Sequence, residues 1–250
     1  MNDRKRVVLV TGSSSGIGQA CVTHFLQSGY AVCGVDVVPR SKATPAPADD
    51  NRYFEFTADI SDSAQCRAAV AATVATFGAL DGLAHLAAIH SMKTWSELNA
   101  FDFEKILAVN VTGSFLISQA AAQHMEKNGG GAIVLTTSSV ISVGGLGGTG
   151  RGGPAYATSK AAIVGLMRSL ARSLAPHNIR VNAVSPGSIS TPMTANYTKE
   201  ALAGVSARTL AGRIGETEEI AQTIGFLMSK DASYIFGEII NVNGGASFGL

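Results

Sequence analysis

The N-terminal segment limits the fold more than any other part of this chain. A β-branched run, Arg4 to Thr11, leads directly into the glycine pattern Gly12-Ser13-Ser14-Ser15-Gly16-Ile17-Gly18, and residues 19–28 then carry apolar side chains at helical spacing. Glycines allow a backbone to approach a pyrophosphate closely, and the free N–H groups at a helix start favour an anion. The order of strand, glycine turn and helix therefore predicts a phosphate-binding unit, with a glycine turn of no function as the alternative.

A second apolar run, Tyr30 to Val35, ends in Asp36. Asp36 follows the last glycine of the loop by roughly 20 residues, where a dinucleotide fold places the acid that binds the adenosine ribose hydroxyls. An aspartate there repels a 2′-phosphate, and neither Ser15 nor Val37 supplies the positive charge that an NADP site requires. The sequence therefore favours NAD over NADP as the cofactor.

The remaining chain alternates apolar runs with amphipathic segments. Further strands are expected at residues 54–58, 80–88, 131–139, 179–184 and 238–242, and helices at residues 62–77 (capped by Ser61), 101–127, 154–176, 193–205 and 216–228. Such alternation implies βαβ units, a parallel sheet and helices on both of its faces. We predict a fold of the α/β class: one doubly wound Rossmann-type domain over residues 1–250, with a central parallel sheet of about seven strands.

Composition and charge exclude several classes of protein. With 19 basic and 18 acidic residues the net charge is +1, so no basic field indicates nucleic acid. No uninterrupted apolar run reaches the ~18 residues that a membrane span needs, and the apolar stretch at the N-terminus is too short for a signal peptide. The three cysteines and five histidines show no disulfide or metal-ligand spacing. We therefore expect a cytoplasmic protein with no metal, no nucleic-acid partner and no membrane segment.

Tyr156 and Lys160 lie four residues apart in the helix expected at residues 154–176, and so share one face. An ammonium beside a phenol favours the phenolate, which turns a poor base into a group able to exchange a proton near neutral pH. Carbonyl and alcohol redox chemistry needs such a group. A lysine that only packs beside a half-buried ring is the alternative.

Together these features make the chain resemble the short-chain dehydrogenase/reductase (SDR) family along essentially its full length. Thr11-Gly12-x-x-x-Gly16-x-Gly18 matches the cofactor loop of that family, and residues 186–191 match the turn that contacts the nicotinamide end. The catalytic tetrad of the family falls, in order, on Asn110, Ser139, Tyr156 and Lys160. The resemblance implies a homotetramer, or a dimer, built through the long helices that hold Asn110 and Tyr156.

The resemblance also implies a role for each of these residues. Tyr156 is the general acid in reduction and the general base in oxidation, while Lys160 lowers the pKa of Tyr156 and binds the nicotinamide ribose. Ser139 hydrogen-bonds the substrate oxygen, and Asn110 holds a water that links Lys160 to solvent as a proton relay. The NAD contacts that the resemblance implies are Gly12, Ser14, Ser15, Gly16, Ile17, Gly18, Asp36, Asp59, Ile60, Leu86, Ala87, Tyr156, Lys160, Pro186, Gly187, Ile189 and Thr191.

The chain departs from the family pattern in two places. His85-Leu86-Ala87-Ala88 stands where the family has Asn-Asn-Ala-Gly, and His85 could replace part of the first asparagine, which ties the sheet together by hydrogen bonds. Intact cofactor binding is the expected outcome, and impaired binding is the alternative. Residues 144–154 are mostly glycine, which predicts a mobile active-site loop at the mouth of the site.

The sequence determines the substrate contacts least. Arg151, in the glycine-rich loop, is either a clamp for an anionic group such as a carboxylate or sulfonate, or a solvated loop arginine. His90 and Met193 are candidate pocket walls, and Met193 begins a substrate-loop helix expected near residues 193–205.

We interpret the chain as an NAD-dependent oxidoreductase that transfers a hydride between the nicotinamide and a secondary alcohol or carbonyl of a small substrate, with anionic and polyhydroxylated substrates both open. A 3-oxoacyl thioester reductase is the alternative, although Asp36 counts against its usual NADPH. A catalytically silent, dinucleotide-sensing regulator is the alternative from another class. Because one fold hosts many chemistries, the sequence does not name the substrate.

Overall fold

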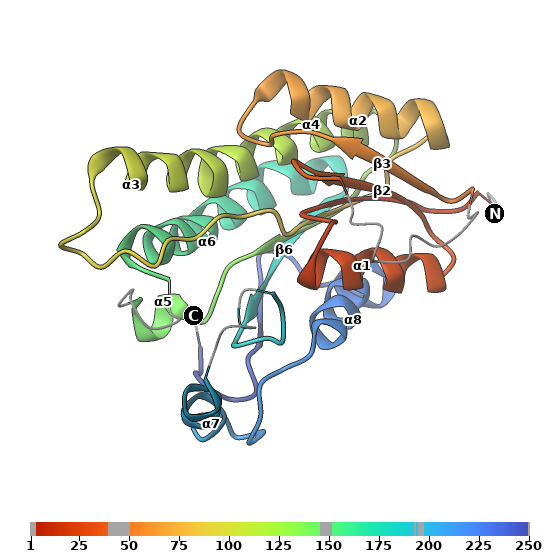
Figure 1. Ribbon diagram of the computed structural model, residues 1–250. Helices are drawn as coiled ribbons and strands as arrows, with labels where there is room; N and C mark the ends of the chain where they lie inside the picture. Colours follow the sequence, from red (N-terminus) through yellow and green to blue (C-terminus); the bar gives the residue numbers. More distant parts are fainter. Residues whose placement is uncertain (1–3, 40–50, 146–151, 193, 195–197, 250) are drawn as a thin grey trace.

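The computed structural model of this chain describes residues 4–39, 51–145, 152–192, 194 and 198–249. Within those residues the chain forms a seven-stranded parallel sheet in the order β3-β2-β1-β4-β5-β6-β7 (Figure 1). The strands are β1 (Val7–Thr11), β2 (Ala31–Asp36), β3 (Tyr53–Thr57), β4 (Gly82–His85), β5 (Gly131–Thr136), β6 (Ile179–Pro186) and β7 (Ile239–Val242). The predicted α/β class and doubly wound Rossmann-type sheet are confirmed.

Helices cover both faces of the sheet (Figure 1). On one face lie α1 (Gly16–Gln27) and α8 (Thr217–Met228), and on the other lie α2 (Ser63–Phe77), α4 (Ser114–Lys127) and α6 (Pro154–Leu174). Shorter helices occupy the connections: α3 (Ala100–Leu107), α5 (Val140–Val143) and α7 (Lys199–Ser206). A π-helical turn (Ala108–Gly113) joins α3 to α4, and 3₁₀ turns follow α6 (Ala175–His177) and α8 (Lys230–Ala232).

Strand side chains alternate between the two helical layers, as the period of two requires. Leu9 and Leu83 belong to the core under α2, α4 and α6, whereas Val8 and Ala84 belong to the core under α1 and α8. The strand order reverses at β1, which pairs with β2 on one side and with β4 on the other. Open α/β sheets bind ligands in the crevice at the carboxyl ends of the strands, at such a reversal.

β4 is shorter than the sequence predicts. It ends at His85 rather than Ala88, because the next amides leave the sheet ladder and donate to a side chain of β1. Leu86 N–H and Ala87 N–H both donate to Thr11 Oγ1, at 3.1 and 3.2 Å. A side-chain acceptor from a distant strand thus turns the backbone toward the crevice.

Two helices begin at residues other than those expected. Asp62 rather than Ser61 caps α2, since its carboxylate accepts hydrogen bonds from two amides of the first turn. α7 begins at Lys199, where the hydroxyl of Thr198 accepts from the backbone, and not at residue 193. Residues 193 and 195–197 lie outside the described residues.

The single helix expected at residues 101–127 is divided into α3, the π-helical turn and α4. The stretch Ala100–Lys127 is long and apolar enough to meet the length and composition criteria for a membrane span, yet half of its most apolar window is buried within the fold. α4 supplies Ile117, Ala121 and Met125 to the core, so its apolar side chains are used in packing against the sheet.

Candidate active site

The glycine loop forms one wall of the crevice. Gly12 has a φ of +67°, and a Cβ there would lie 2.9 Å from the backbone nitrogen of Ala87. A Cβ on Gly18 would overlap the carbonyl oxygen of Gly12, so both positions require glycine. Gly16 faces the turn after β6, where a Cβ on it would lie 3.3 Å from the methyl of Thr191. The loop and this turn therefore stand opposite each other.

The start of α1 is suited to an anion. Ser15 is the N-cap residue of α1 and makes no side-chain capping bond, so the helix start is not closed by its own cap. The first N–H groups of a helix have no partner within the helix and favour negative charge. Ile17 packs into the core from the first turn, which fixes the helix start against the sheet.

Asp36 at the end of β2 is tied to the glycine loop. Its carboxylate accepts hydrogen bonds from Ser14 N–H (3.0 Å) and Val38 N–H (3.2 Å), and the Ser14 hydroxyl donates to the Val38 carbonyl (2.7 Å). The predicted ribose-binding acid and the predicted phosphate loop are therefore adjacent in the structure.

Asp59 and Ile60 follow β3 on the same side of the sheet. The carboxylate of Asp59 accepts from the amide and hydroxyl of Ser61, at 2.9 and 2.7 Å. The side chain of Ile60 is buried, and a Cβ on Gly113 would lie 2.9 Å from its Cδ1. Ile60 thus packs the end of β3 against the π-helical turn.

Tyr156 and Lys160 lie on the first turns of α6, as predicted. Lys160 is buried, its ammonium donates to the carbonyl oxygen of Thr136 (2.9 Å), and it lies 5.7 Å from the centre of the Tyr156 ring. Burial lowers the pKa of Lys160 to about 8. Burial raises the pKa of Tyr156, and a hydrogen bond with Ser138 opposes that shift.

Ser138 lies next to the predicted Ser139, and a hydrogen bond with its side chain opposes the rise in the pKa of Tyr156. Both serines follow β5, which ends at Thr136 and not at residue 139 as the sequence predicts. Ser139 is the N-cap residue of α5, and its N–H donates to the carbonyl of Pro186 (3.0 Å). Ser138 is thus a further candidate site residue, and Ser139 stays the predicted donor to the substrate oxygen.

Asn110 occupies the π-helical turn and is 1% exposed. Its side chain accepts from Ile89 N–H (2.8 Å) and donates to the Ile89 carbonyl (2.8 Å) and to Ser159 Oγ (2.9 Å). The hydroxyl of Ser159 donates in turn to the Tyr156 carbonyl (2.7 Å). Both amide protons are used within the protein, so a relay water would have to donate to an oxygen of Asn110, and its backbone carbonyl is the acceptor that we expect.

His85 replaces the asparagine of the family pattern with two buried hydrogen bonds. Its Nδ1 lies 2.7 Å from Thr11 Oγ1, and its Nε2 lies 2.8 Å from Ser114 Oγ. Its backbone carbonyl accepts from the hydroxyl of Thr136 (2.9 Å). These contacts join β4 to β1, β5 and α4, so the expected tie across the sheet is present.

Only one of the three candidate substrate residues lies within the described structure. His90 is exposed and stands edge-on to Tyr156, with 6.4 Å between ring centres. Its flanks are fixed, because Asn110 binds Ile89 and the amide of Gly153 donates to the Ser91 carbonyl (3.0 Å). Arg151 and Met193 lie outside the described residues, as does most of the glycine-rich loop.

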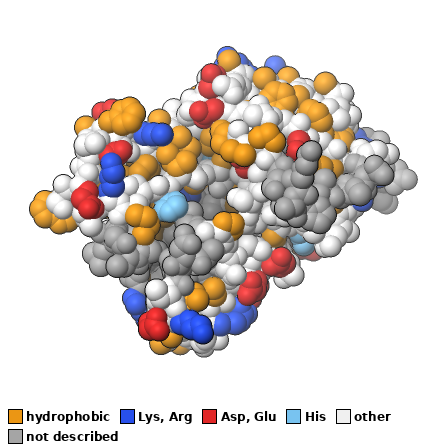
Figure 2. Space-filling view, viewed as in Figure 1, with side chains coloured by type: hydrophobic (Ala, Val, Ile, Leu, Met, Phe, Trp, Pro, Cys, Tyr) orange, Lys and Arg blue, Asp and Glu red, His pale blue; other side chains and the backbone are white. Residues whose placement is uncertain are grey.

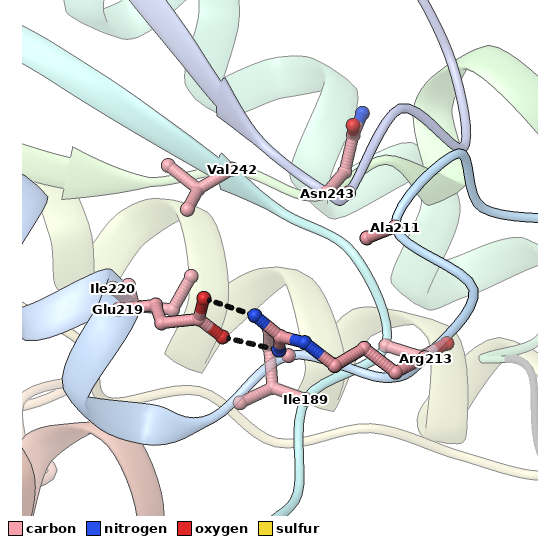
Figure 3. A pocket seen from close by; sticks show the side chains of 10 residues that line it. Ile189, Ala211, Arg213, Glu219, Ile220, Val242 and Asn243 are labelled. Carbon is pink, nitrogen blue, oxygen red and sulfur yellow. Dashed lines mark hydrogen bonds and ion pairs between the residues drawn. The ribbon is translucent and has the colours of Figure 1, made fainter. Parts of the chain in front are cut away.

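The turn after β6 holds the residues expected at the nicotinamide end. Gly187 packs against Asn243, and a Cβ there would lie 2.8 Å from the Asn243 Cα. Ile189 lines a small cavity of about 70 Å³, shown in Figure 3, across which Arg213 and Glu219 form a two-pronged ion pair at 2.7 and 2.8 Å. A pocket for a small ligand measures roughly 300–1,000 Å³, so this cavity is smaller than a typical ligand site.

Charge around the crevice is mixed. In Figure 2, side chains of both signs gather at the lower edge, around α7. Lys199 and Glu200 of α7 are both exposed there. No single sign of charge dominates that edge, so it provides no strong field to attract a highly charged ligand.

The carboxyl edge of the sheet thus carries a glycine loop, an acid at the end of β2, a buried lysine and a tyrosine hydrogen-bonded to a serine. These features define an oxidoreductase that binds a dinucleotide.

Comparison with known proteins agrees with this class. A family model described as enoyl-(acyl carrier protein) reductase matches residues 12–247. The chain is 38% identical to a 3alpha-hydroxysteroid dehydrogenase of Mediterraneibacter gnavus, over 97% of both chains. It is 34% identical to a 3-oxoacyl-[acyl-carrier-protein] reductase of Thermotoga maritima, over 96% of this chain and 97% of the relative.

Solved structures show the same likeness. A short-chain dehydrogenase/reductase described as glucose/ribitol dehydrogenase, from Brucella melitensis, superposes with a TM-score of 0.87 at 30% identity, over 98% of each chain. Levodione reductase superposes with a TM-score of 0.86 at 34% identity, over 97% of each chain. The chain belongs to the short-chain dehydrogenase/reductase family. The relatives named above are dehydrogenases and reductases that act on hydroxyl or carbonyl groups.

The buried charge of Lys160 predicts a pH-dependent stability. The folded pKa of about 8 lies below the ordinary value of 10.5, so below pH 8 the folded protein holds a buried charge that the unfolded chain keeps in water. Between pH 8 and 10.5 the unfolded state binds more protons, so this cost is relieved as pH rises. Lys160→Met should raise the free energy of unfolding at pH 7 by on the order of 2 kcal/mol, and the gain should shrink toward pH 10.5.

Thermal or urea unfolding of wild type and Lys160→Met across this pH range measures the effect. Lys105→Met, which alters an exposed lysine of α3, is the matched control and should show no such pH dependence. A difference between Lys160→Met and wild type that stays constant from pH 7 to 10.5 would contradict the lowered pKa.

Proposed function

We propose that this protein is an NAD-dependent dehydrogenase that transfers a hydride between the nicotinamide and a secondary alcohol or carbonyl of a small substrate. The observation that carries the proposal is the group formed by Tyr156, Ser138 and the buried Lys160 at the mouth of the dinucleotide crevice. Two further features suit a dinucleotide. A Cβ on Gly12 or Gly18 would clash, so the loop backbone is free to approach a phosphate, and the Asp36 carboxylate is bound to the same loop.

Each side chain has a distinct task in the proposed reaction. The nicotinamide, when bound, donates or accepts the hydride. Tyr156 gives its phenolic proton to the substrate oxygen in reduction and takes it back in oxidation. Ser139 donates a hydrogen bond to the same oxygen as negative charge develops on it, and Ser138, beside Tyr156, is the alternative donor. Lys160 holds the nicotinamide ribose, and the backbone carbonyl of Asn110 holds the relay water.

Several observations bear on the substrate. Relatives of this chain include a 3alpha-hydroxysteroid dehydrogenase and levodione reductase, so cyclic alcohols and ketones lead the substrates to be tested. Others are 3-oxoacyl-[acyl-carrier-protein] reductases and (3R)-3-hydroxyacyl-CoA dehydrogenases, which keeps the thioester alternative open. The tyrosine, serine and lysine group argues against a silent dinucleotide sensor.

His90, beside Tyr156, is the described residue best placed to contact the substrate. We also keep the hypothesis that Arg151 binds an anionic group of the substrate. We propose that the protein is located in the cytoplasm.

The first experiment is nicotinamide absorbance across a panel of hydroxysteroids, cyclic alcohols, sugars, hydroxy acids and 3-hydroxyacyl thioesters, each with NAD and with NADP. We expect kcat/KM for NAD to exceed that for NADP at least about tenfold, because like charges placed together cost on the order of several kcal/mol. Asp36→Ala should narrow that ratio, whereas Asp231→Ala, at an exposed aspartate after α8, should not. Preference of the wild type for NADP would contradict the NAD assignment, and NAD binding without turnover would favour the sensor.

The neighbouring serines provide a matched pair of variants. Ser139→Ala should lower kcat/KM by about 10²–10³, the usual loss when one donor to a developing oxyanion is removed. Ser138→Ala should lower it less, since Ser138 bonds the side chain of Tyr156 and, in this proposal, not the substrate oxygen. The reverse order of effects in steady-state kinetics would move the role to Ser138.

We also propose that the protein forms a homotetramer, or a dimer, through α4 and α6. Ala161 and Gly165 on α6 are exposed, and a Cβ on Gly165 would meet nothing within 4 Å. Phe115 of α4 is 39% exposed. Gly165→Arg should therefore leave the subunit folded but reduce the mass measured by light scattering, whereas Gly165→Ala should not. A wild type that is monomeric, or an unchanged mass for Gly165→Arg, would contradict this interface.

A further inference from the structure

His85 lies at the centre of a buried line of hydrogen bonds that reaches beyond the tie between strands, to the π-helical turn, and has no part in the proposed reaction. Thr11, His85 and Ser114 are each 3% exposed or less. Thr11 Oγ1 lies 2.7 Å from His85 Nδ1, and His85 Nε2 lies 2.8 Å from Ser114 Oγ. Ser114 Oγ lies 2.5 Å from the carbonyl oxygen of Asn110. The line runs from the carboxyl end of β1, through β4, to the π-helical turn.

The partners at the β1 end decide which ring nitrogen of His85 carries the proton. Thr11 Oγ1 already accepts from the amides of Leu86 and Ala87, which can only donate. A hydroxyl has two lone pairs and one proton, so the Thr11 proton is the group left to bind His85 Nδ1. His85 Nδ1 is therefore an acceptor and bears no proton.

The partners at the other end give the same answer independently. The carbonyl of Asn110 only accepts, so the Ser114 hydroxyl must donate its proton to it. Ser114 Oγ is then free to accept, and His85 Nε2 must donate. Burial, and then the charge of Lys160, lower the pKa of His85 to about 3, which keeps the ring neutral near pH 7. One neutral tautomer, protonated at Nε2, satisfies every bond along the line.

The two ends of the line adjoin the two halves of the proposed site. At one end Thr11 precedes Gly12, whose backbone approaches Ala87 so closely that a Cβ there would lie 2.9 Å from its nitrogen. At the other end Asn110 binds Ile89 and Ser159, and the Ser159 hydroxyl donates to the carbonyl of Tyr156. A shift of the glycine loop can therefore reach the turn that sets Asn110 and the helix of Tyr156.

We propose that His85 is a positioning residue that couples the glycine loop to the Asn110 turn, so that dinucleotide binding fixes the catalytic turn. The coupling rests on the proposed dehydrogenase function, because it gives the turn its catalytic purpose. His85 transfers no proton itself: its single allowed tautomer makes the line rigid and directional.

Ser114→Ala tests the coupling, because it cuts the line between His85 and Asn110 and leaves the bond between His85 and Thr11 in place. Ser118→Ala is the matched control: Ser118 lies one turn further along α4, is fully buried, and has no hydrogen-bond partner for its hydroxyl among the described residues. Hydrogen–deuterium exchange of residues 108–113, with and without NAD, measures the coupling without turnover.

We expect NAD to slow this exchange in the wild type and in Ser118→Ala, and to slow it about three- to tenfold less in Ser114→Ala, the loss of one neutral hydrogen bond. In steady-state kinetics, kcat of Ser114→Ala should fall by a similar factor, while its KM for NAD stays within about twofold. If Ser114→Ala and Ser118→Ala behave alike in both measurements, the coupling is overturned.

Two His85 variants and one spectrum test the histidine itself. Asparagine keeps one donor and one acceptor, so His85→Asn should retain most of the NAD-dependent slowing, whereas His85→Leu, of similar size and without polar atoms, should lose it. The 15N NMR spectrum of the protein labelled at its histidines should show, at pH 7, that His85 is protonated at Nε2 and unprotonated at Nδ1. A proton on Nδ1, or equal behaviour of the two variants, would overturn the proposal.

These readouts separate this proposal from the proposed function. If no alcohol is oxidised yet NAD slows exchange in the wild type and not in His85→Leu, the dehydrogenase assignment fails and the coupling stands. If an alcohol is oxidised and Ser114→Ala matches Ser118→Ala, the enzyme assignment stands and the coupling fails.

Discussion

The buried side-chain amide of Asn110 holds together the catalytic end of this structure. One amide binds both backbone groups of Ile89 and the hydroxyl of Ser159, and so joins the π-helical turn, the segment after β4 and α6. A buried amide is stable only when its hydrogen bonds are made, so each of these segments is fixed relative to the other two. The position of His90 and that of Tyr156 both follow from this arrangement.

The buried charge of Lys160 lowers the stability of the folded protein. The ammonium of Lys160 is buried and donates to the carbonyl of Thr136, but this hydrogen bond does not fully replace the lost hydration, so the pKa of Lys160 falls to about 8. Charged groups held this way are typical of functional sites. The same burial raises the pKa of Tyr156, so the proton that the proposed reaction needs stays on the phenol near neutral pH.

Much of the fold could be predicted from the sequence, because strands buried on both faces and amphipathic helices leave periodic patterns that local chain geometry imposes. The strands, the glycine loop, Asp36 and the pair Tyr156 and Lys160 are where the sequence places them. Predictions failed where a distant side chain decides. β4 ends early because Thr11 Oγ1 accepts the next two amides, and β5 ends at Thr136, before the two serines that the sequence placed in the strand.

The sequence by itself determined the fold class, the family and the residues available for catalysis, since these depend on the order and spacing of residues along the chain. Only the tertiary structure decided which groups Asn110 hydrogen-bonds, and that His85 is neutral with its proton on Nε2. The physical reason is that protonation states and hydrogen-bond partners depend on burial and on neighbours far apart in sequence. Thr11, His85 and Ser114 become one unit only when β1, β4 and α4 are packed together.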